Sequence, residues 1–334
     1  MEKRIDNPTD LADVRAFLTK GESVIVQFSS PDYTLHTLQK LDEIALHHGN
    51  NLQIRFYGHY QSTFDFNVLK FLPNVRNLSV DCLSSAINFM ALDEMTNLSR
   101  LHIGIDNELP KDFLSMENLF SLDSLVMGPS KNKNLDLSHL IKYKKLKELF
   151  LAGHTKHIDS IRNLTALEKL GLSLIGKAQP LSFINTLHSL KSLMIILGGR
   201  DNIDEVTNSS VESMEIIRIR GLQKFDASKF PSLKRLRIED QIQIHELSFS
   251  EDSPDLKSIS IVNCKGLEKI DGLSKLKSLE SLHFCNTKLN IDKLALQGFP
   301  QSLHEINFYT NSNKANKEIH LKLTSWGYKS RSIS

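Results

Sequence analysis

Apolar residues recur along the chain in one spacing that returns about every two dozen residues. In each copy they lie three positions apart and then close into an apolar-x-apolar step, as in Ile158, Ile161, Leu164, Leu167, Leu170 and Leu172. Two further copies, beginning at Leu181 and Ile270, keep the same spacing. The apolar-x-apolar step has the two-residue alternation of a strand with one buried face. The pattern therefore predicts one short strand and one return segment in every repeat.

The starts of these apolar cores divide the chain into nearly equal units of 21 to 24 residues. The first apolar residues of the cores are Val75, Leu98, Leu122, Leu146, Leu167, Leu190, Val211, Leu233, Leu256, Leu279 and Leu303. Met214 could also open a core, but the match of residues 213–225 with 258–270 favours Val211 and aligns Ile219 with Cys264. Such units are too short for two packed helices, whose repeats usually exceed about thirty residues. The spacing therefore favours a strand-containing solenoid over a helical bundle.

Repeats of this length and spacing resemble the leucine-rich-repeat family, specifically the short-repeat kind found in bacterial internalins and phosphatase-regulatory proteins. The resemblance covers roughly residues 64–310. It implies an α/β leucine-rich-repeat solenoid, a curved horseshoe with a parallel sheet on its concave face. The family usually places asparagine three residues beyond the last apolar core position, but here those places hold Leu83, Asp106, His154, Ile175, Gly198, Ile219, Gln241, Cys264 and Thr287. We therefore expect an uneven ladder of hydrogen bonds inside the solenoid.

The open ends of a solenoid must be closed by atypical segments. Residues 1–63 are predicted to form an αβ N-terminal cap continuous with the repeats of residues 64–310, with a first helix capped by Thr9 or Asp10. Residues 311–334 form a C-terminal cap or tail, in which alternation permits a strand and the spacing of Ile319, Leu323 and Trp326 permits a helix. The single tryptophan, Trp326, is interpreted as a core plug for the last turn rather than a partner contact.

Charge and cysteine content narrow the partners and the compartment. The net charge of +2, from 41 Lys and Arg against 39 Asp and Glu, argues against nucleic acid as a partner. No apolar run is long enough for a signal peptide or a membrane span, so neither secretion nor membrane insertion is indicated. Three cysteines without a CxxC pair favour a reducing, cytoplasmic setting. We expect a monomer when the chain is alone.

No catalytic, cofactor or metal motif emerges from the sequence. The close histidine pairs, His47 with His48 and His154 with His157, have no neighbouring cysteine and no HExxH frame. Gly198-Gly199 is interpreted as a turn, and His283 beside Cys285 lacks an acidic residue to orient a nucleophile. About 25 residues follow the last repeat, too few for a further enzyme domain. We therefore predict no enzyme activity, no cofactor and no metal.

Side chains between the core apolar residues should point outward from the concave sheet, where a partner could bind. Apolar outward residues gather in the central repeats with charged residues beside them, an arrangement typical of a binding hot spot. The predicted partner-binding residues are Val126, Phe150, Met194, Ile196, Glu215, Ile217, Arg235, Arg237, His283 and Tyr309. The hypothesis is a module that binds a folded protein such as a toxin or a signalling enzyme, with an immunity-protein or antitoxin-like inhibitor as its special case. A regulatory adaptor and a secreted adhesin that has lost its signal peptide are the alternatives.

Overall fold

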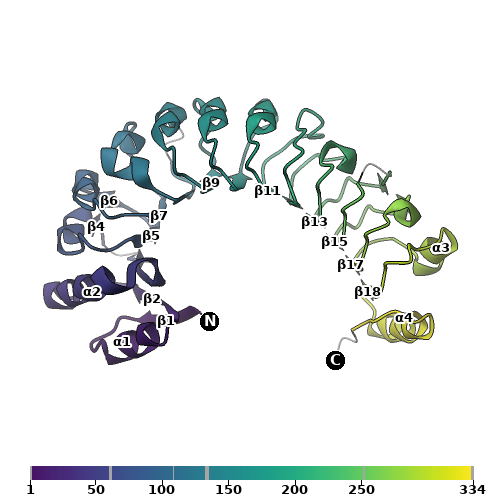
Figure 1. Cartoon of the computed structure of the whole chain (residues 1–334), viewed down its shortest axis with the longest axis horizontal. Helices are drawn as coiled ribbons and strands as arrows, with labels where there is room; N and C mark the ends of the chain where they lie inside the picture. The colour runs from purple at the N-terminus through teal and green to yellow at the C-terminus, as the bar shows by residue number, and fades with distance from the viewer. Residues whose placement is uncertain (1, 60–61, 108, 132–134, 251–252, 332–334) are drawn as a thin grey trace. The chain divides into compact units, whose positions relative to one another are not determined.

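The computed structural model describes residues 2–59, 62–107, 109–131, 135–250 and 253–331, and it divides into two compact units. Unit 1 comprises residues 1–167 and unit 2 comprises residues 168–334. Figure 1 labels the helices and strands of both.

Seven parallel strands form the main sheet of unit 1, in the order in which the chain meets them. They are β1 (Glu2–Asp6), β2 (Ser23–Phe28), β3 (Leu52–Tyr57), β5 (Asn77–Leu83), β7 (Arg100–Ile105), β8 (Ser124–Met127) and β9 (Glu148–Ala152). The return segments contain α1 (Ala12–Thr19), α2 (Leu35–His48) and the 3-10 helices η1 (Gly49–Asn51), η2 (Phe66–Phe71), η3 (Phe89–Glu94), η4 (Phe113–Ser115), η5 (Glu117–Ser121), η6 (Leu137–Lys142) and η7 (Ile158–Asn163). A two-stranded ladder joins β4 (Phe64–Asp65) to β6 (Ala86–Ile87) among these returns.

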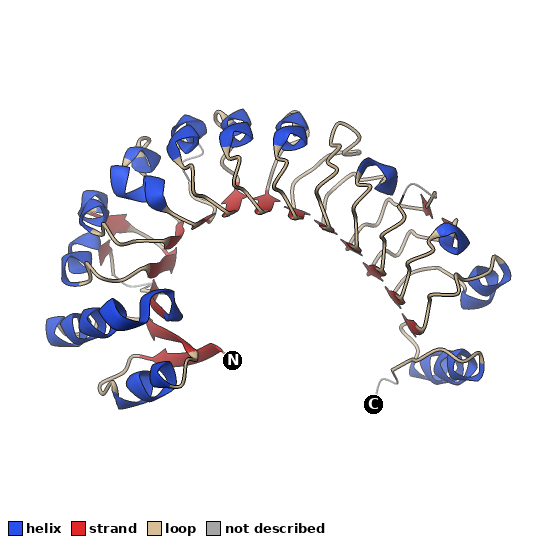
Figure 2. Cartoon of the chain, in the orientation of Figure 1, coloured by secondary structure: helices blue, strands red, loops and turns tan. Residues whose placement is uncertain are grey.

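Unit 2 repeats the arrangement with seven more parallel strands. They are β10 (Lys169–Ser173), β11 (Ser192–Ile196), β12 (Ser213–Ile217), β13 (Arg235–Glu239), β15 (Ser258–Val262), β17 (Ser281–Cys285) and β18 (Glu305–Tyr309). The return segments hold η8 (Ser182–Thr186), η9 (Ala227–Lys229), η10 (Leu273–Lys275), α3 (Ile291–Leu296), α4 (Asn313–Ser325) and the short pair β14 (Glu246–Ser248) and β16 (Lys269–Asp271). In each unit the strands line one side of the coil and most helices lie on the other (Figure 2). This confirms the predicted α/β leucine-rich-repeat solenoid.

The three-residue apolar spacing explains why most return segments form 3-10 helices. A 3-10 helix has three residues per turn, so residues three apart lie on the same face. In η7 this face carries Ile158 and Ile161, which are buried together with Leu164 and Leu167. Leu170 and Leu172 then alternate inward from β10, and each buried leucine contributes about 1.5–3 kcal/mol. The predicted register at Val211 is also correct, because Met214 and Ile216 pair with Leu236 and Ile238.

The positions where the family usually carries asparagine hold a mixed set of polar and apolar groups, most of them buried. The Nε2 of His154 lies 3.0 Å from the carbonyl oxygen of Gly128, and the Nε2 of Gln241 donates to the carbonyl oxygen of Glu239 at 3.0 Å. Ile175 and Ile219 fill the same position with buried apolar side chains. Hydrogen bonding therefore alternates with apolar packing along the inside of the coil.

The terminal segments agree only partly with the sequence prediction. Strand β1, which pairs with β2, was not predicted, whereas the helix-strand order that follows it was. The tail forms a helix, α4, whose first turn is capped by the Ser312 side chain accepting from the backbone N–H of Ala315. The interpretation of Trp326 as a core plug is wrong, because 40% of its surface is exposed, whereas Leu323 of α4 is fully buried. The boundaries at residues 63 and 310 remain predictions.

Candidate functional site

The register of unit 2 aligns the predicted outward residues into two straight rows. One row passes from Met194 through Glu215 and Arg237 to His283, with Ser260 between the last two. The second row consists of Ile196, Ile217, Glu239, Val262, Cys285 and Tyr309. Strand alternation turns both rows away from the leucine core. The predicted positions therefore do lie next to one another, while their role in binding stays a prediction.

Apolar side chains gather at one end of these rows. Met194 and Ile196 lie on β11, and Ile217 lies beside Ile196 on β12. All three are partly exposed, although the inward residues Leu193, Ile195 and Ile216 are buried. We call Met194, Ile196 and Ile217 the apolar patch of unit 2. The patch lies on an ordered surface, since both strands are hydrogen-bonded within the sheet.

Charged residues border this apolar patch on β13. Arg235 and Arg237 are exposed, and the Nε of Arg237 donates to a carboxylate oxygen of Glu239 at 3.0 Å. Glu215 lies beside Arg237 in the register. The border therefore presents both signs of charge on neighbouring strands.

His283 and Tyr309 form the other end of the rows. Their rings pack edge to face with centroids 5.6 Å apart, and the Tyr309 hydroxyl donates to the carbonyl oxygen of Arg331 at 2.9 Å. Burial and the positive charges of Arg237 and Arg331 lower the pKa of His283. His283 is therefore neutral near pH 7 and serves this surface as an aromatic group.

Val126 and Phe150 belong to unit 1, whereas the apolar patch defined above belongs to unit 2. They lie opposite each other on β8 and β9, and both are partly exposed. The predicted apolar group thus consists of one pair in unit 1 and one patch in unit 2.

A polar network on the outward side of unit 1 was not predicted. The guanidinium of Arg55 on β3 donates twice to the Asp81 carboxylate on β5, and both distances are 2.7 Å. Ser79 Oγ donates to Asp81 at 2.9 Å and lies 3.2 Å from Nδ1 of His102. Strand alternation places Ser79, Asp81 and His102 on the outward face, but Arg55 lies in the N-terminal cap, where no repeat spacing aligns it with them. The alternation of inward and outward residues along β3 and β5 was the signal that could have placed Arg55 and Asp81 on the same face of the sheet.

The described residues bring together no group of three or more His, Cys, Asp or Glu side chains that could hold a metal ion. Burial raises the pKa of Cys285, which disfavours the thiolate, and the neighbouring His283 is neutral near pH 7. The Ser79 hydroxyl is fully buried and its proton points to Asp81 rather than to a histidine base. Neither arrangement supplies an activated nucleophile.

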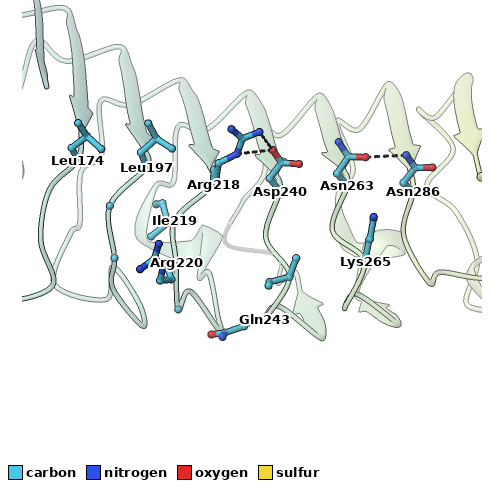
Figure 3. Close-up of a pocket in the computed structure, with 14 residues that line it drawn as sticks. Leu174, Leu197, Arg218, Ile219, Arg220, Asp240, Gln243, Asn263, Lys265 and Asn286 are labelled. Atoms are coloured by element: carbon cyan, nitrogen blue, oxygen red, sulfur yellow. Dashed lines mark hydrogen bonds and ion pairs between the residues drawn. The ribbon is translucent and has the colours of Figure 1, made fainter. Parts of the chain in front are cut away.

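A groove of about 870 Å³ opens in unit 2 beyond the carboxyl ends of the strands (Figure 3). Its rim carries a row of residues, each directly after the last residue of its strand: Leu174, Leu197, Arg218, Asp240, Asn263 and Asn286. Gly198 and Gly199, predicted as a turn, line the wall below the rim. The groove was not foreseen, because the sequence pattern does not show where these rim side chains point.

Two solved structures share the fold of the chain. An internalin (inlF) from Listeria monocytogenes aligns with a TM-score of 0.55 and 20% identity over 98% of this chain and 95% of its own. A leucine-rich-repeat protein of Leptospira interrogans aligns with a TM-score of 0.51 and 17% identity over 93% of this chain and 89% of its own. No protein-family model and no curated protein matches the sequence. At these identities the likeness establishes the leucine-rich-repeat fold.

Among the described residues, no helix combines the length and apolar character that crossing a bilayer requires.

Proposed function

We propose that the chain is a non-enzymatic protein-binding module that engages a folded protein through the outward face of its sheet. The observation that carries the proposal is the apolar patch of Met194, Ile196 and Ile217, which is partly exposed on neighbouring strands beside Arg235 and Arg237. These side chains point away from the leucine core, so folding does not require them to be apolar. Adjacent exposed apolar residues with a charged border are typical of a binding hot spot.

Rigidity supports the same function. The strands that carry the patch are interior members of the main sheet of unit 2, paired on both sides. A surface that is ordered before binding loses little conformational entropy when a partner arrives. Val126 and Phe150 give unit 1 a second, smaller apolar surface of the same construction.

The finer proposal is that binding inhibits the partner by covering its functional surface, as an immunity or antitoxin-like protein does, in the cytoplasm. Occlusion follows from geometry, because a sheet face several strands wide covers an area on the scale of a standard interface, about 800 Å² per partner. An adaptor would instead leave the activity of its partner unchanged.

The test is a comparative capture from the cells that express the chain, using the wild type, Ile217→Asp and Leu296→Asp. Leu296 is 88% exposed at the end of α3, outside the sheet face, and serves as the matched control. We expect wild type and Leu296→Asp to retain the same protein and Ile217→Asp to lose it about tenfold, equivalent to about 1.4 kcal/mol. Phe150→Ala tests the surface of unit 1 in the same way. Equal retention by Ile217→Asp contradicts the proposal, and an activity assay of the captured protein with and without the chain distinguishes inhibition from scaffolding.

A further inference from the structure

The rim residues of the groove share an unusual backbone conformation. Leu174, Leu197, Arg218, Asp240, Asn263 and Asn286 all have positive φ, between 51° and 59°. The backbone N–H of each donates to the last carbonyl of the following strand, as Leu174 does to Ile196 at 3.2 Å and Leu197 does to Ile217 at 2.9 Å. The left-handed turn thus extends the ladder by one bond and directs the side chain out of the sheet, as Figure 3 shows for the row.

Stability does not explain the leucines at this rim. Left-handed backbone is strained for most side chains and is best tolerated by glycine and asparagine. The chain does use Asn263 and Asn286 at the equivalent places of later turns. Leu174 nevertheless combines the strain with 45% exposure, and Ile242, which also lines the groove, is 66% exposed. Leu174 and Leu197 therefore add apolar surface to the groove at strained backbone positions, and the exposed side chain of Ile242 adds more.

The charges of the groove are predominantly positive. Arg218 and Asp240 form an ion pair and offset each other, with Nε of Arg218 3.0 Å from the carboxylate. Arg220 and Lys265 also line the groove, are exposed, and have no ion-pair partner within the described part of the chain. Two uncompensated cations beside three apolar side chains favour an occupant with carboxylates and apolar groups together.

The backbone turn that lines the groove does not require glycine at Gly199. Glycine is needed at Gly198, where φ is 91° and an added Cβ would lie 2.4 Å from the carbonyl oxygen of Ile175. At Gly199 the backbone is ordinary, and an added Cβ would meet only the carbonyl oxygen of Arg220 at 3.6 Å, a normal contact. The fold therefore accepts a side chain at Gly199, and because Gly199 lines the groove we expect that side chain to occupy part of it.

We propose that this groove binds an extended acidic segment of a protein partner, with leucine-like side chains seated against Leu174, Leu197 and Ile242 and carboxylates at Arg220 and Lys265. The proposal rests on the proposed function, since the segment belongs to a bound partner. Six strands at a spacing of about 4.8 Å make the rim about 24 Å long, which matches about seven extended residues at about 3.3 Å each. The groove lies beside the sheet face. It therefore adds a second contact, specific for the sequence of the bound segment, to the contact made by Met194, Ile196 and Ile217.

The test uses a fluorescent eight-residue peptide in which glutamate and leucine alternate, with fluorescence anisotropy as the readout. We expect the wild type to bind it at least about tenfold more tightly than Gly199→Leu, which fills the groove, and than the double variant Arg220→Glu with Lys265→Glu. Gly176→Leu is the matched control, because Gly176 is exposed, has open space around its Cβ position and lies outside the lining of the groove. It should bind as the wild type does.

Two altered peptides test the chemistry of the segment. Replacing glutamate by lysine, or leucine by serine, should each weaken binding at least about tenfold. Absence of binding by the wild type, unchanged binding by Gly199→Leu, or equal affinity for either altered peptide would overturn the proposal.

The sheet variant Ile217→Asp separates this proposal from the proposed function. It should bind the peptide normally while losing the captured partner. If Gly199→Leu captures the partner as well as the wild type does, the groove is not a partner contact. The proposed function of the sheet face is then unaffected. Peptide binding without any Ile217-dependent capture would reject the sheet-face function alone.

Discussion

Arg55 and Asp81 form an ion pair with two hydrogen bonds across the neighbouring strands β3 and β5. Asp81 is 4% exposed, and its burial alone would raise the pKa of the carboxyl group. Hydrogen bonds from Arg55 and Ser79 and the nearby His102 outweigh burial, so the pKa of Asp81 lies below its ordinary value. Asp81 therefore remains charged in the folded protein and stabilises the first turns of unit 1.

Replacing Asp81 by asparagine should lower the free energy of unfolding of unit 1 by about 1–3 kcal/mol, because Arg55 loses its charged acceptor. The stability that Asp81 contributes is present above the unfolded pKa of about 4 and is lost as the pH falls through the lower folded pKa, so the variant should also be less sensitive to acid. Thermal unfolding at pH 7 and pH 3 measures both effects. Asp240→Asn, which breaks the more exposed pair with Arg218, should cost under about 1 kcal/mol. An equal loss in the free energy of unfolding for the two variants would show that the buried pair stabilises the protein no more than the exposed pair does.

His154 should make unit 1 less stable on mild acidification. Its side chain is 1% exposed, and burial lowers its pKa more than the hydrogen bond to the carbonyl of Gly128 raises it. The unfolded chain therefore binds a proton first, so the stability present above about pH 6.5 falls as the pH drops, by at most about 1.4 kcal/mol per pH unit. His154→Asn places the residue typical of leucine-rich repeats at this position and should reduce the loss of stability between pH 7 and pH 5. An unchanged pH dependence of the melting temperature would argue against this role for His154.

Leu174→Asn should raise the stability of unit 2 by up to about 1 kcal/mol, because asparagine tolerates the left-handed backbone better than leucine. Leu46→Asn is the control, since Leu46 is also exposed but lies inside helix α2. There asparagine should lower stability by about 0.5 kcal/mol through its weaker helix propensity. Chemical denaturation measures the two changes, and a shared sign would contradict the conformational explanation.

A charge in the leucine core should unfold several turns rather than one. Leu193 is fully buried between Leu170 and Met214 on neighbouring strands, so Leu193→Asp leaves an unpaired charge inside the stack. Hydrogen exchange should show lost protection across β10, β11 and β12 together. Met194→Asp, one residue away but facing outward, should leave that protection intact. Loss confined to β11 would contradict the shared core.

The sequence predicted the repeats well because burial itself produces the pattern. Leu170 and Leu172 must both face inward, which fixes the strand and its register. The three-residue spacing of the apolar residues before them is that of a short 3-10 return segment, so the length of this segment also follows from the apolar positions. The same alternation placed Met194, Ile196 and Ile217 on the outward face. Those positions required no knowledge of the return segments.

Features that depend on side-chain direction or on long-range alignment were not predictable from that pattern. Arg55 and Asp81 are joined across the cap and the first repeat, where no repeat spacing links β3 to β5. Leu174 and Leu197 adopt a conformation that leucine seldom adopts, so nothing in their identity signals an outward rim. Trp326 lies just past the end of α4, and helical spacing alone did not show which residue of the tail would be buried.

Oxidative footprinting at Met194 tests the central claim most directly, because methionine reports its own solvent access. Met194 lies in the apolar patch of unit 2, whereas Met90 is 64% exposed on η3, a return segment of unit 1. With the captured partner bound, oxidation of Met194 should slow at least about fivefold, since a hot spot excludes water, while Met90 should react at an unchanged rate. Equal oxidation of Met194 in the free and bound protein would contradict binding through this sheet face.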